Sequence, residues 1–343
     1  MREPVGEFIN SEKVTEKVNK WLSTNTFHYK DFSDIDELIE LKKEKNQKIT
    51  LAIPTLNEGK NIGKVIKKIK SHLVTEKPLL DEIIIVDSGS TDNTRSAVIK
   101  GGGKFYLSQE YGKEGVSSAG KGSNLWTTLY VAEGDIISWI DADIRNIDSL
   151  FVYGTVGPLL KNDSFNYTKG FYDRPLETMH RGKKLLLEQG GGRVTEIMAR
   201  PLINRYFKLL TGFIQPLSGE YAGRRKILEQ IPFYPSYSVE IGLLIDISER
   251  FGIDCMAQVD LIEREHSPNS LKKLGEMAYV ILLSVVEEKV KEYNKDSFRE
   301  DTRRYRLPVV SYDKIRQKYI YTLEEKLFLG GKQLPPMKYL KGD

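Results

Sequence analysis

One stretch constrains this chain more than any other: residues 135–143, DIISWIDAD, where an apolar run ends in two carboxylates one residue apart. A short run rich in β-branched residues, bounded by Gly134 and by polar residues, indicates a buried parallel strand. Ligands of open α/β sheets gather at the carboxyl ends of strands, which is where Asp141 and Asp143 fall. Two anions there need a cation or hydrogen bonds to hold them. The stretch therefore predicts either a divalent ion that shares diphosphate oxygens, or carboxylates that cap the following helix.

Composition narrows the classes of protein. A chain of 343 residues can form one large domain or two smaller ones. Lys and Arg number 52 against 48 Asp and Glu, and the net charge of +4 is too small to indicate a nucleic-acid binder, although it suits small anionic substrates. A single cysteine, Cys255, excludes an internal disulfide and any multi-cysteine metal site, and it fits a reducing cytoplasm.

No membrane segment is predicted. Residues 1–10 lack the apolar core of a signal peptide, and the chain has no run of 18 apolar residues. The most apolar long stretch, 277–286, is too short to span a bilayer. We therefore expect a soluble, cytoplasmic protein that binds neither membranes nor nucleic acids.

Two further buried strands are predicted at 48–53 and 82–86, each followed by a polar turn and a helix. The turn after the first strand could have a purely structural role, as a connection between strand and helix in which Asn57 caps the helix and Glu58 lies at its positive end. The turn after the second, DSGSTDNT at 87–94, has ordinary loop chemistry but is crowded with oxygen groups. Such units imply a right-handed parallel sheet. Neither turn has the P-loop or dinucleotide-binding motif, which disfavours those classes.

Two glycine-rich segments carry basic residues. In SAGKG, at 118–122, the glycines let a ligand approach the backbone, and Lys121 offers a charge for phosphate or is merely solvated. In QGGGRVTE, at 189–196, three glycines precede a helix whose first turn holds Arg193 and Thr195. Charge, hydroxyl and helix end coincide there, so we predict an anion cradle, with a flexible loop as the alternative.

Three later features leave two interpretations each. Glu240 lies in the first turn of a predicted helix, where a glutamate often only compensates the helix dipole. His266 follows a predicted strand at 253–262 as Asp143 follows its own, so a neutral imidazole could complete a metal shell, although most single histidines have no such role. Apolar residues at helical spacing from 271 to 290 predict a helix in the core or at a subunit interface.

The polar strand ends resemble those in the nucleotide-binding half of GT-A glycosyltransferases, which many sugar transferases share. They are PTLNE at 54–58, DSGSTD at 87–92 and DAD at 141–143. Four later segments are more specific, in this order: GGGRVTE at 190–196, ARPL at 199–202, QPLSGEYA at 215–222 and VEIGLLID at 239–246. Together they resemble the glucosyl-3-phosphoglycerate synthase family, with the mannosyl enzymes as close neighbours, from about Thr50 to His266.

The resemblance implies a role for each matching residue. Pro54, Leu56, Glu58 and Ser88 would line the base and ribose of a nucleotide sugar, and Lys121 would meet its diphosphate. Asp141 would face the sugar and ribose, with Glu240 beside the transferred sugar, as the two catalytic residues. Asp143 and His266 would hold a divalent metal, Mg²⁺ or alternatively Mn²⁺ or Co²⁺. Gly192, Arg193 and Thr195 would bind the acceptor. In the family further acceptor residues follow the histidine, but here Ser267 and Pro268 intervene before Asn269.

The resemblance also implies a GT-A-type α/β fold with a mixed sheet. We expect an N-terminal extension (1–47, packed on the domain or partly loose), a Rossmann-like nucleotide-sugar half (48–147), an acceptor half (148–269) and a C-terminal helical region (270–343). The implied activity is retaining, metal-dependent transfer of glucose from UDP- or GDP-glucose to 3-phosphoglycerate by a homodimer. The alternatives are mannosyl transfer to that acceptor, a polyprenyl-phosphate sugar transferase, and a non-catalytic nucleotide-binding protein.

Overall fold

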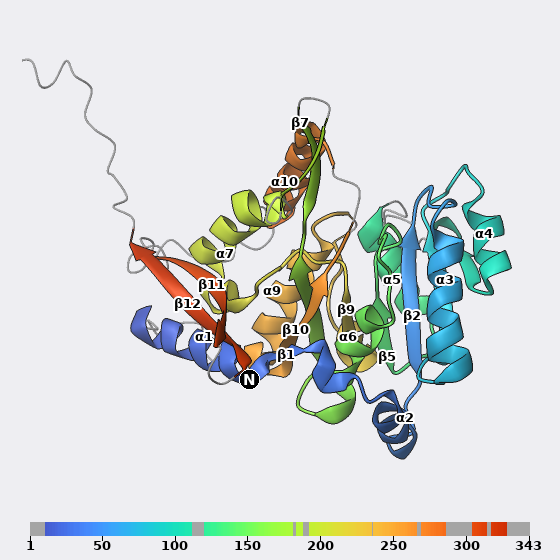
Figure 1. Ribbon diagram of the computed structural model, residues 1–343, viewed down its shortest axis with the longest axis horizontal. Helices are drawn as coiled ribbons and strands as arrows, with labels where there is room; N and C mark the ends of the chain where they lie inside the picture. The colour runs from blue at the N-terminus through green and yellow to red at the C-terminus, as the bar shows by residue number, and fades with distance from the viewer. Residues whose placement is uncertain are drawn as a thin grey trace, which may run out of the picture.

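A computed structural model describes residues 11–111, 120–180, 183–187, 192–234, 236–265, 269–285, 304–313 and 317–327. Its central sheet contains β1 (Thr26–His28), β2 (Ile49–Thr55), β3 (Glu82–Asp87), β4 (Lys104–Leu107), β5 (Ile136–Trp139), β6 (Tyr167–Asp173), β9 (Tyr221–Arg224) and β10 (Met256–Glu263). The strand order is β1-β10-β6-β9-β5-β2-β3-β4 (Figure 1). Strand β9 runs antiparallel to β5 and β6, whereas the other neighbours pair in parallel. The mixed α/β sheet expected from the sequence is confirmed.

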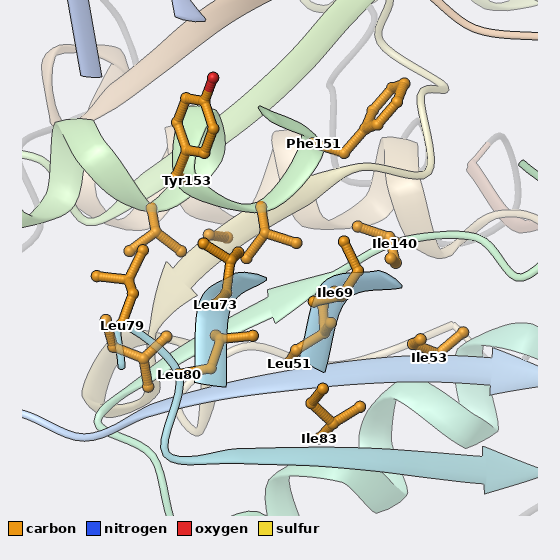
Figure 2. Close-up of a cluster of buried hydrophobic side chains, with 14 of the residues drawn as sticks. Leu51, Ile53, Ile69, Leu73, Leu79, Leu80, Ile83, Ile140, Phe151 and Tyr153 are labelled. Carbon is orange, nitrogen blue, oxygen red and sulfur yellow. The ribbon is translucent and has the colours of Figure 1, made fainter. Parts of the chain in front are cut away.

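The central strands are apolar on both faces because helices cover both sides of the sheet. Leu51 and Ile53 of β2 point into one core, and Ala52 between them points into the other. The first core lies under α2 (Ile35–Glu44), α3 (Ile62–Lys70) and α6 (Leu150–Lys161). In Figure 2, Leu51 and Ile53 lie below Ile69 of α3 and Phe151 of α6. The continuous apolar runs that predicted buried strands therefore reflect a three-layer packing.

The second core lies under α1 (Ser11–Asn25), α5 (Lys121–Val131), α7 (Arg200–Tyr206) and α9 (Val239–Phe251). Trp21 of α1 is 1% exposed, and its Nε1 donates to the carbonyl oxygens of Ile253 and Met256, each at 3.0 Å. Strand β1 then extends the sheet along β10. From residue 11 onward, the expected N-terminal extension is thus packed on the domain and is part of its sheet.

The remaining elements surround this sheet. They are α4 (Thr94–Gly101), α8 (Arg225–Leu228), α10 (Leu271–Ser284), the hairpin β7 (Leu176–His180)–β8 (Lys183–Leu187) and the hairpin β11 (Arg304–Asp313)–β12 (Lys318–Leu327), with short 3₁₀ and π segments between them. Among the residues that the structure describes, no helix has the length and apolar character needed to cross a bilayer.

One expectation for the C-terminal region is wrong. Residues 270–343 were expected to be helical, and α10 agrees, but 304–313 and 318–327 form an antiparallel hairpin that packs along α1 (Figure 1). The hairpin is rich in valine, isoleucine, threonine and tyrosine, which pack well on a pleated surface. Helical periodicity in α10 therefore does not extend to 304–313 and 318–327.

All parallel strands end at the same edge of the sheet, because β9 reverses direction once between β5 and β6. Five of these strands lead at this edge into loops that carry polar side chains. The loop residues that come just after the strands are Leu56, Ser88, Asp141, Arg174 and Arg264, and all but Leu56 are polar. This edge is where open α/β sheets bind ligands.

Candidate functional site

A cleft of about 510 Å³ opens at this edge. Every predicted site residue that the structure describes lines it: Pro54, Leu56, Glu58, Ser88, Lys121, Asp141, Asp143, Gly192, Arg193, Thr195, Glu240 and Asn269. His266, the other predicted metal ligand, lies outside the described residues. The fold thus brings together side chains that are more than half the chain apart in sequence.

The loops after β2 and β3 fix each other's position. Asn57 has a left-handed φ of 57°, and its Oδ1 accepts from the backbone N–H of Thr91 at 2.9 Å. The expectation that Asn57 caps the next helix is wrong, because α3 begins only at Ile62, with Asn61 in the cap position. Asn57 instead holds the two loops together, and Ser88 donates to Asn124 of α5 at 2.8 Å. The walls on this side of the cleft are therefore built from cross-linked turns.

Lys121, at the start of α5, joins two carboxylates at the base of the cleft. Its Nζ lies 2.5 Å from Oδ1 of Asp141 and 2.7 Å from Oε1 of Glu240. Burial alone would lower the pKa of Lys121, but the two carboxylates outweigh burial and raise that pKa well above its ordinary value. Burial likewise opposes ionisation of Asp141, yet Lys121 and Arg264 hold its pKa well below the usual range. Lys121 and Asp141 are therefore both charged at neutral pH.

Arg264 connects the second side of the same cluster. Its side chain is 3% exposed, and its Nη2 lies 2.9 Å from Oδ2 of Asp141 and 2.6 Å from Oδ1 of Asp143. Its Nε is 3.3 Å from Oε1 of the fully buried Glu220. Sequence reasoning gave no role to Arg264 or to Arg174, although each directly follows a strand and Asp141 lies two residues beyond one. The same strand-end signal could have identified both arginines.

Asp143 offers a hard oxygen ligand beside a surplus of negative charge. Its side chain is 42% exposed, and with Asp141 it adds to the effect of burial in raising the pKa of Glu58. Such a surplus, with carboxylate donors, suits a divalent cation. No group of three or more His, Cys, Asp or Glu side chains gathers into a metal site among the described residues.

The predicted anion cradle lies at the other wall of the cleft. Gly192 has a left-handed φ of 72°, and the chain then turns into the π segment Thr195–Ala199, which continues as α7. Nη2 of Arg193 donates to the carbonyl oxygen of Asn269 at 2.9 Å, while Thr195 is 5% exposed. Gly190 and Gly191 lie outside the described residues. The arginine is thus held against the cleft instead of standing free in solvent.

Sequence comparisons bear on this arrangement. Residues 50–231 match the family model described as Glycosyl transferase family 2. The glucosyl-3-phosphoglycerate synthase of Petrotoga mobilis is 49% identical over 270 residues, which make up 79% of this chain and 82% of that enzyme. The enzyme of the same name from Mycobacterium tuberculosis is 42% identical over 238 residues, or 69% of this chain and 72% of the relative.

Solved structures show the same likeness. Glucosyl-3-phosphoglycerate synthase from Mycobacterium tuberculosis, in complex with Mn²⁺, UDP-glucose and phosphoglyceric acid, superposes with a TM-score of 0.68 at 33% identity, covering 92% of this chain and 99% of that one. Another crystal of that enzyme holds Mg²⁺ and UDP. Mannosyl-3-phosphoglycerate synthase from Rubrobacter xylanophilus superposes with a TM-score of 0.73 at 31% identity, covering 90% of this chain and 96% of the other.

Proposed function

Because the chain belongs to glycosyl transferase family 2, and within it to the glucosyl-3-phosphoglycerate synthases, we propose that it transfers glucose from UDP-glucose to 3-phosphoglycerate. One observation carries the proposal: a single cleft joins the Lys121–Asp141–Glu240 cluster to the Arg193–Thr195 helix start. The first group suits a sugar diphosphate, and the second suits a small phosphorylated acceptor. UDP is chosen over GDP because the related enzyme binds UDP-glucose.

On the donor side, Pro54, Leu56, Glu58 and Ser88 form the wall for the base and ribose. Lys121 is placed to meet the diphosphate, and Asp141 and Glu240 the sugar. Since Lys121 lies between the two carboxylates and offsets part of their negative charge, they can accept hydrogen bonds from sugar hydroxyls with less mutual repulsion. The proposed donor site thus includes Glu240, which belongs to the proposed acceptor half (148–269), together with residues of the proposed donor half (48–147).

On the acceptor side, the backbone at Gly192, the fork of Arg193 and the hydroxyl of Thr195 hold the phosphate. Asn269 remains beside them through its bond to Arg193, despite the two intervening residues after His266. The acceptor hydroxyl is then aimed at the anomeric carbon from the face that the diphosphate leaves. We expect retention of the α configuration without an enzyme nucleophile.

A divalent ion fits beside Asp143, with His266 as the second protein ligand. When bound, it supplies charge neutralisation for the diphosphate as this group departs. Mg²⁺ is the ion we propose, and Mn²⁺ is the other candidate because the related enzyme binds either. Arg264, which contacts Asp141 and Asp143 together, keeps both carboxylates oriented toward the cleft.

A nucleotide-sugar panel tests the proposal. The chain is incubated with 3-phosphoglycerate, Mg²⁺ and UDP-glucose, GDP-glucose, UDP-mannose or GDP-mannose, and products are identified by mass and by the coupling of the anomeric proton. We expect an α-linked glucosyl product from UDP-glucose. A mannosyl product would show instead the activity of mannosyl-3-phosphoglycerate synthase, whose structure this chain also resembles. Nucleotide binding without turnover of any donor would favour a non-catalytic protein.

We further propose that the enzyme is a homodimer and acts in the cytoplasm. Helix α10 buries Ile281 but exposes Leu271, Tyr279, Leu282 and Leu283 by 42–71%, and apolar surface on this scale is typical of an interface. Residue 286, at the end of the stretch expected to pair, lies outside the described residues. Light scattering at micromolar concentration tests the dimer, since a monomer mass would exclude it.

A further inference from the structure

Arg174 and Arg264 both follow strands at the edge of the cleft, but their charges are used differently. Arg264 contacts Asp141, Asp143 and Glu220. Arg174 lines the cleft, yet within the described part of the chain no carboxylate lies at ion-pair distance from it. Lys121 forms ion pairs with both Asp141 and Glu240. Arg174 is therefore a cationic group beside the sugar site whose charge is matched by no carboxylate of the described residues.

The guanidinium of Arg174 is nevertheless held in place. It lies over the ring of Tyr172, 5.0 Å from the ring centroid, and its Nη2 donates to the Tyr172 hydroxyl at 2.7 Å. That hydroxyl in turn donates to Oε2 of Glu220 at 2.5 Å. Nε of Arg174 is shielded from solvent and has no hydrogen-bond partner among the residues that the structure describes. A stacked, oriented guanidinium with unused donors is prepared for a planar anion.

The position of Arg174 separates it from the phosphate cradle. Its charge acts on Asp141, and it is one of the groups that hold the pKa of that carboxyl down. Arg193, by contrast, is tied to the start of the α10 segment through Asn269. Lys273, a third cation on the cleft wall, belongs to α10 itself and is exposed. Arg174 is therefore placed with the sugar-binding groups, whereas Arg193 and Lys273 lie with the acceptor wall.

The chemistry of the acceptor requires a cation beside the sugar. 3-Phosphoglycerate has one free hydroxyl, on the same carbon that bears its carboxylate, and its phosphate is on the next carbon. When that hydroxyl meets the anomeric carbon, the carboxylate must lie next to the donor sugar while the phosphate points away. The negative carboxylate would face Asp141 and Glu240, so it needs a positive partner there.

We propose that Arg174 binds the carboxylate of the acceptor and selects for substrates that carry one. The inference rests on the proposed function and adds a second anion site to the phosphate cradle. Arg174 and Arg193 then receive the two anionic ends of the acceptor. With both ends held, the hydroxyl between them is fixed in direction, which is the orientation that group transfer needs.

The test compares acceptors that lack one end. 3-Phosphoglycerate carries both anions, and glycerol 3-phosphate retains the phosphate and the neighbouring hydroxyl but lacks the carboxylate. Competition assays against 3-phosphoglycerate give the inhibition constant of glycerol 3-phosphate for wild type, Arg174→Met and Arg174→Lys. The control is Arg205→Met, because Arg205 also lies over a neighbouring tyrosine ring, at 5.6 Å, but away from the cleft.

We expect Arg174→Met to lower kcat/KM for 3-phosphoglycerate about 10- to 100-fold and to leave the inhibition constant of glycerol 3-phosphate and the Kd of UDP unchanged. Arg174→Lys should recover only part of the loss, and Arg205→Met should behave as wild type. The proposal would be overturned if Arg174→Met raised the inhibition constant of glycerol 3-phosphate as much as it lowered kcat/KM for 3-phosphoglycerate, or if it weakened UDP binding. If Arg174→Met does not fold, as judged by its unfolding curve, Arg174→Gln takes its place. A wild type that does not glucosylate 3-phosphoglycerate would instead refute the proposed function, a separate outcome.

Discussion

Nζ of Lys121 lies 2.7 Å from Oε1 of Glu240, so one buried ion pair joins the first helix turn after the glycine-rich segment to the first turn of α9. The same nitrogen lies 2.5 Å from Asp141 at the end of β5. A single cation thus connects the proposed donor half to the proposed acceptor half. The geometry of the sugar site depends on this lysine as well as on the two carboxylates.

Lys121→Met should destabilise the fold by about 3 kcal/mol, because it leaves the buried Glu240 and the partly buried Asp141 with less positive charge nearby. The low pKa of Asp141 stabilises the folded state above the ordinary range of aspartate, and this contribution is lost progressively as the pH falls below that range toward the lowered pKa. The difference between wild type and variant should therefore shrink below about pH 4. Urea unfolding at neutral and acid pH measures both effects.

The control for this substitution is Lys68→Met. Lys68 pairs with Asp148 at 3.2 Å, but both side chains are about half exposed, so the change should cost less than about 1 kcal/mol. Similar destabilisation by the two substitutions would show that the Lys121 cluster contributes no more than a surface ion pair.

Asp143→Asn should weaken Mn²⁺ or Mg²⁺ binding in the presence of UDP by at least about 10-fold, since it removes a charged oxygen ligand. His266→Ala should have a similar effect. Calorimetry of metal binding is the direct measurement, and turnover in metal-buffered solution is the second. Asp148→Asn, an exposed acid outside the cleft, is the matched control. Full turnover by either variant at limiting metal would exclude the shared site.

The strand ends could be predicted from sequence because each depends on residues that are neighbours in the chain. Apolar runs end abruptly at Thr55, Asp87 and Asp141, and parallel strands must place these ends together. The helix start at Arg193 was recognisable for the same reason, since glycines, charge and hydroxyl are neighbours in the chain. The sequence therefore predicted residues that line the cleft even where it did not predict the side chains that pair with them.

The contacts between distant segments could not be predicted. Strand β9 has only four residues and includes Gly223, so its insertion between β5 and β6 depends on pairing across the chain and not on its own pattern. The same limit hid the pairing of Lys121 with Glu240 and of Arg264 with Asp141. Strand β1, at the sheet edge, has three residues and gives no periodicity to read.

Arg193→Ala should raise the KM for 3-phosphoglycerate by about one to two powers of ten, because it removes a charge-assisted bond to the acceptor phosphate. The Kd of UDP-glucose should stay nearly constant. Arg193→Lys should rescue only partly, since a point charge cannot bind two oxygens as a fork does. Steady-state kinetics and calorimetry separate the two substrates. Loss of nucleotide binding, or unchanged acceptor kinetics, would place the phosphate elsewhere.

Trp21→Ala should destabilise the protein by about 3–5 kcal/mol, as expected for removal of a fully buried aromatic side chain. The indole also donates to two carbonyl oxygens beside β10, and these acceptors would lose their partner. Thermal or urea unfolding gives the size of the effect, with Lys20→Ala on the exposed face of α1 as the control. A loss below about 1 kcal/mol would mean that the N-terminal helix is only loosely attached.

Lys169 of β6 is 1% exposed, donates to the carbonyl oxygen of Ser218 at 2.9 Å and lies 4.4 Å from the centroid of the Tyr221 ring. Burial lowers its pKa to about 7, although Glu240, Glu220 and Asp141 favour the charged form. Between about pH 7 and the ordinary value of 10.5, the unfolded chain therefore binds more protons at this position than the folded chain. The free energy of unfolding should rise with pH through this window and lose that contribution below it.

Lys169→Met removes the titrating group and should remove that rise. Relative to the variant, wild type should gain up to about 1.4 kcal/mol per pH unit between pH 7 and pH 9, and the difference should be constant below about pH 6. The lost bond to Ser218 adds an offset that does not depend on pH, so only the slope is decisive. Urea unfolding of both proteins at one-unit intervals measures it. Parallel curves from pH 6 to pH 9 would show that Lys169 keeps its proton when buried, with the carboxylates of the cleft holding its charge.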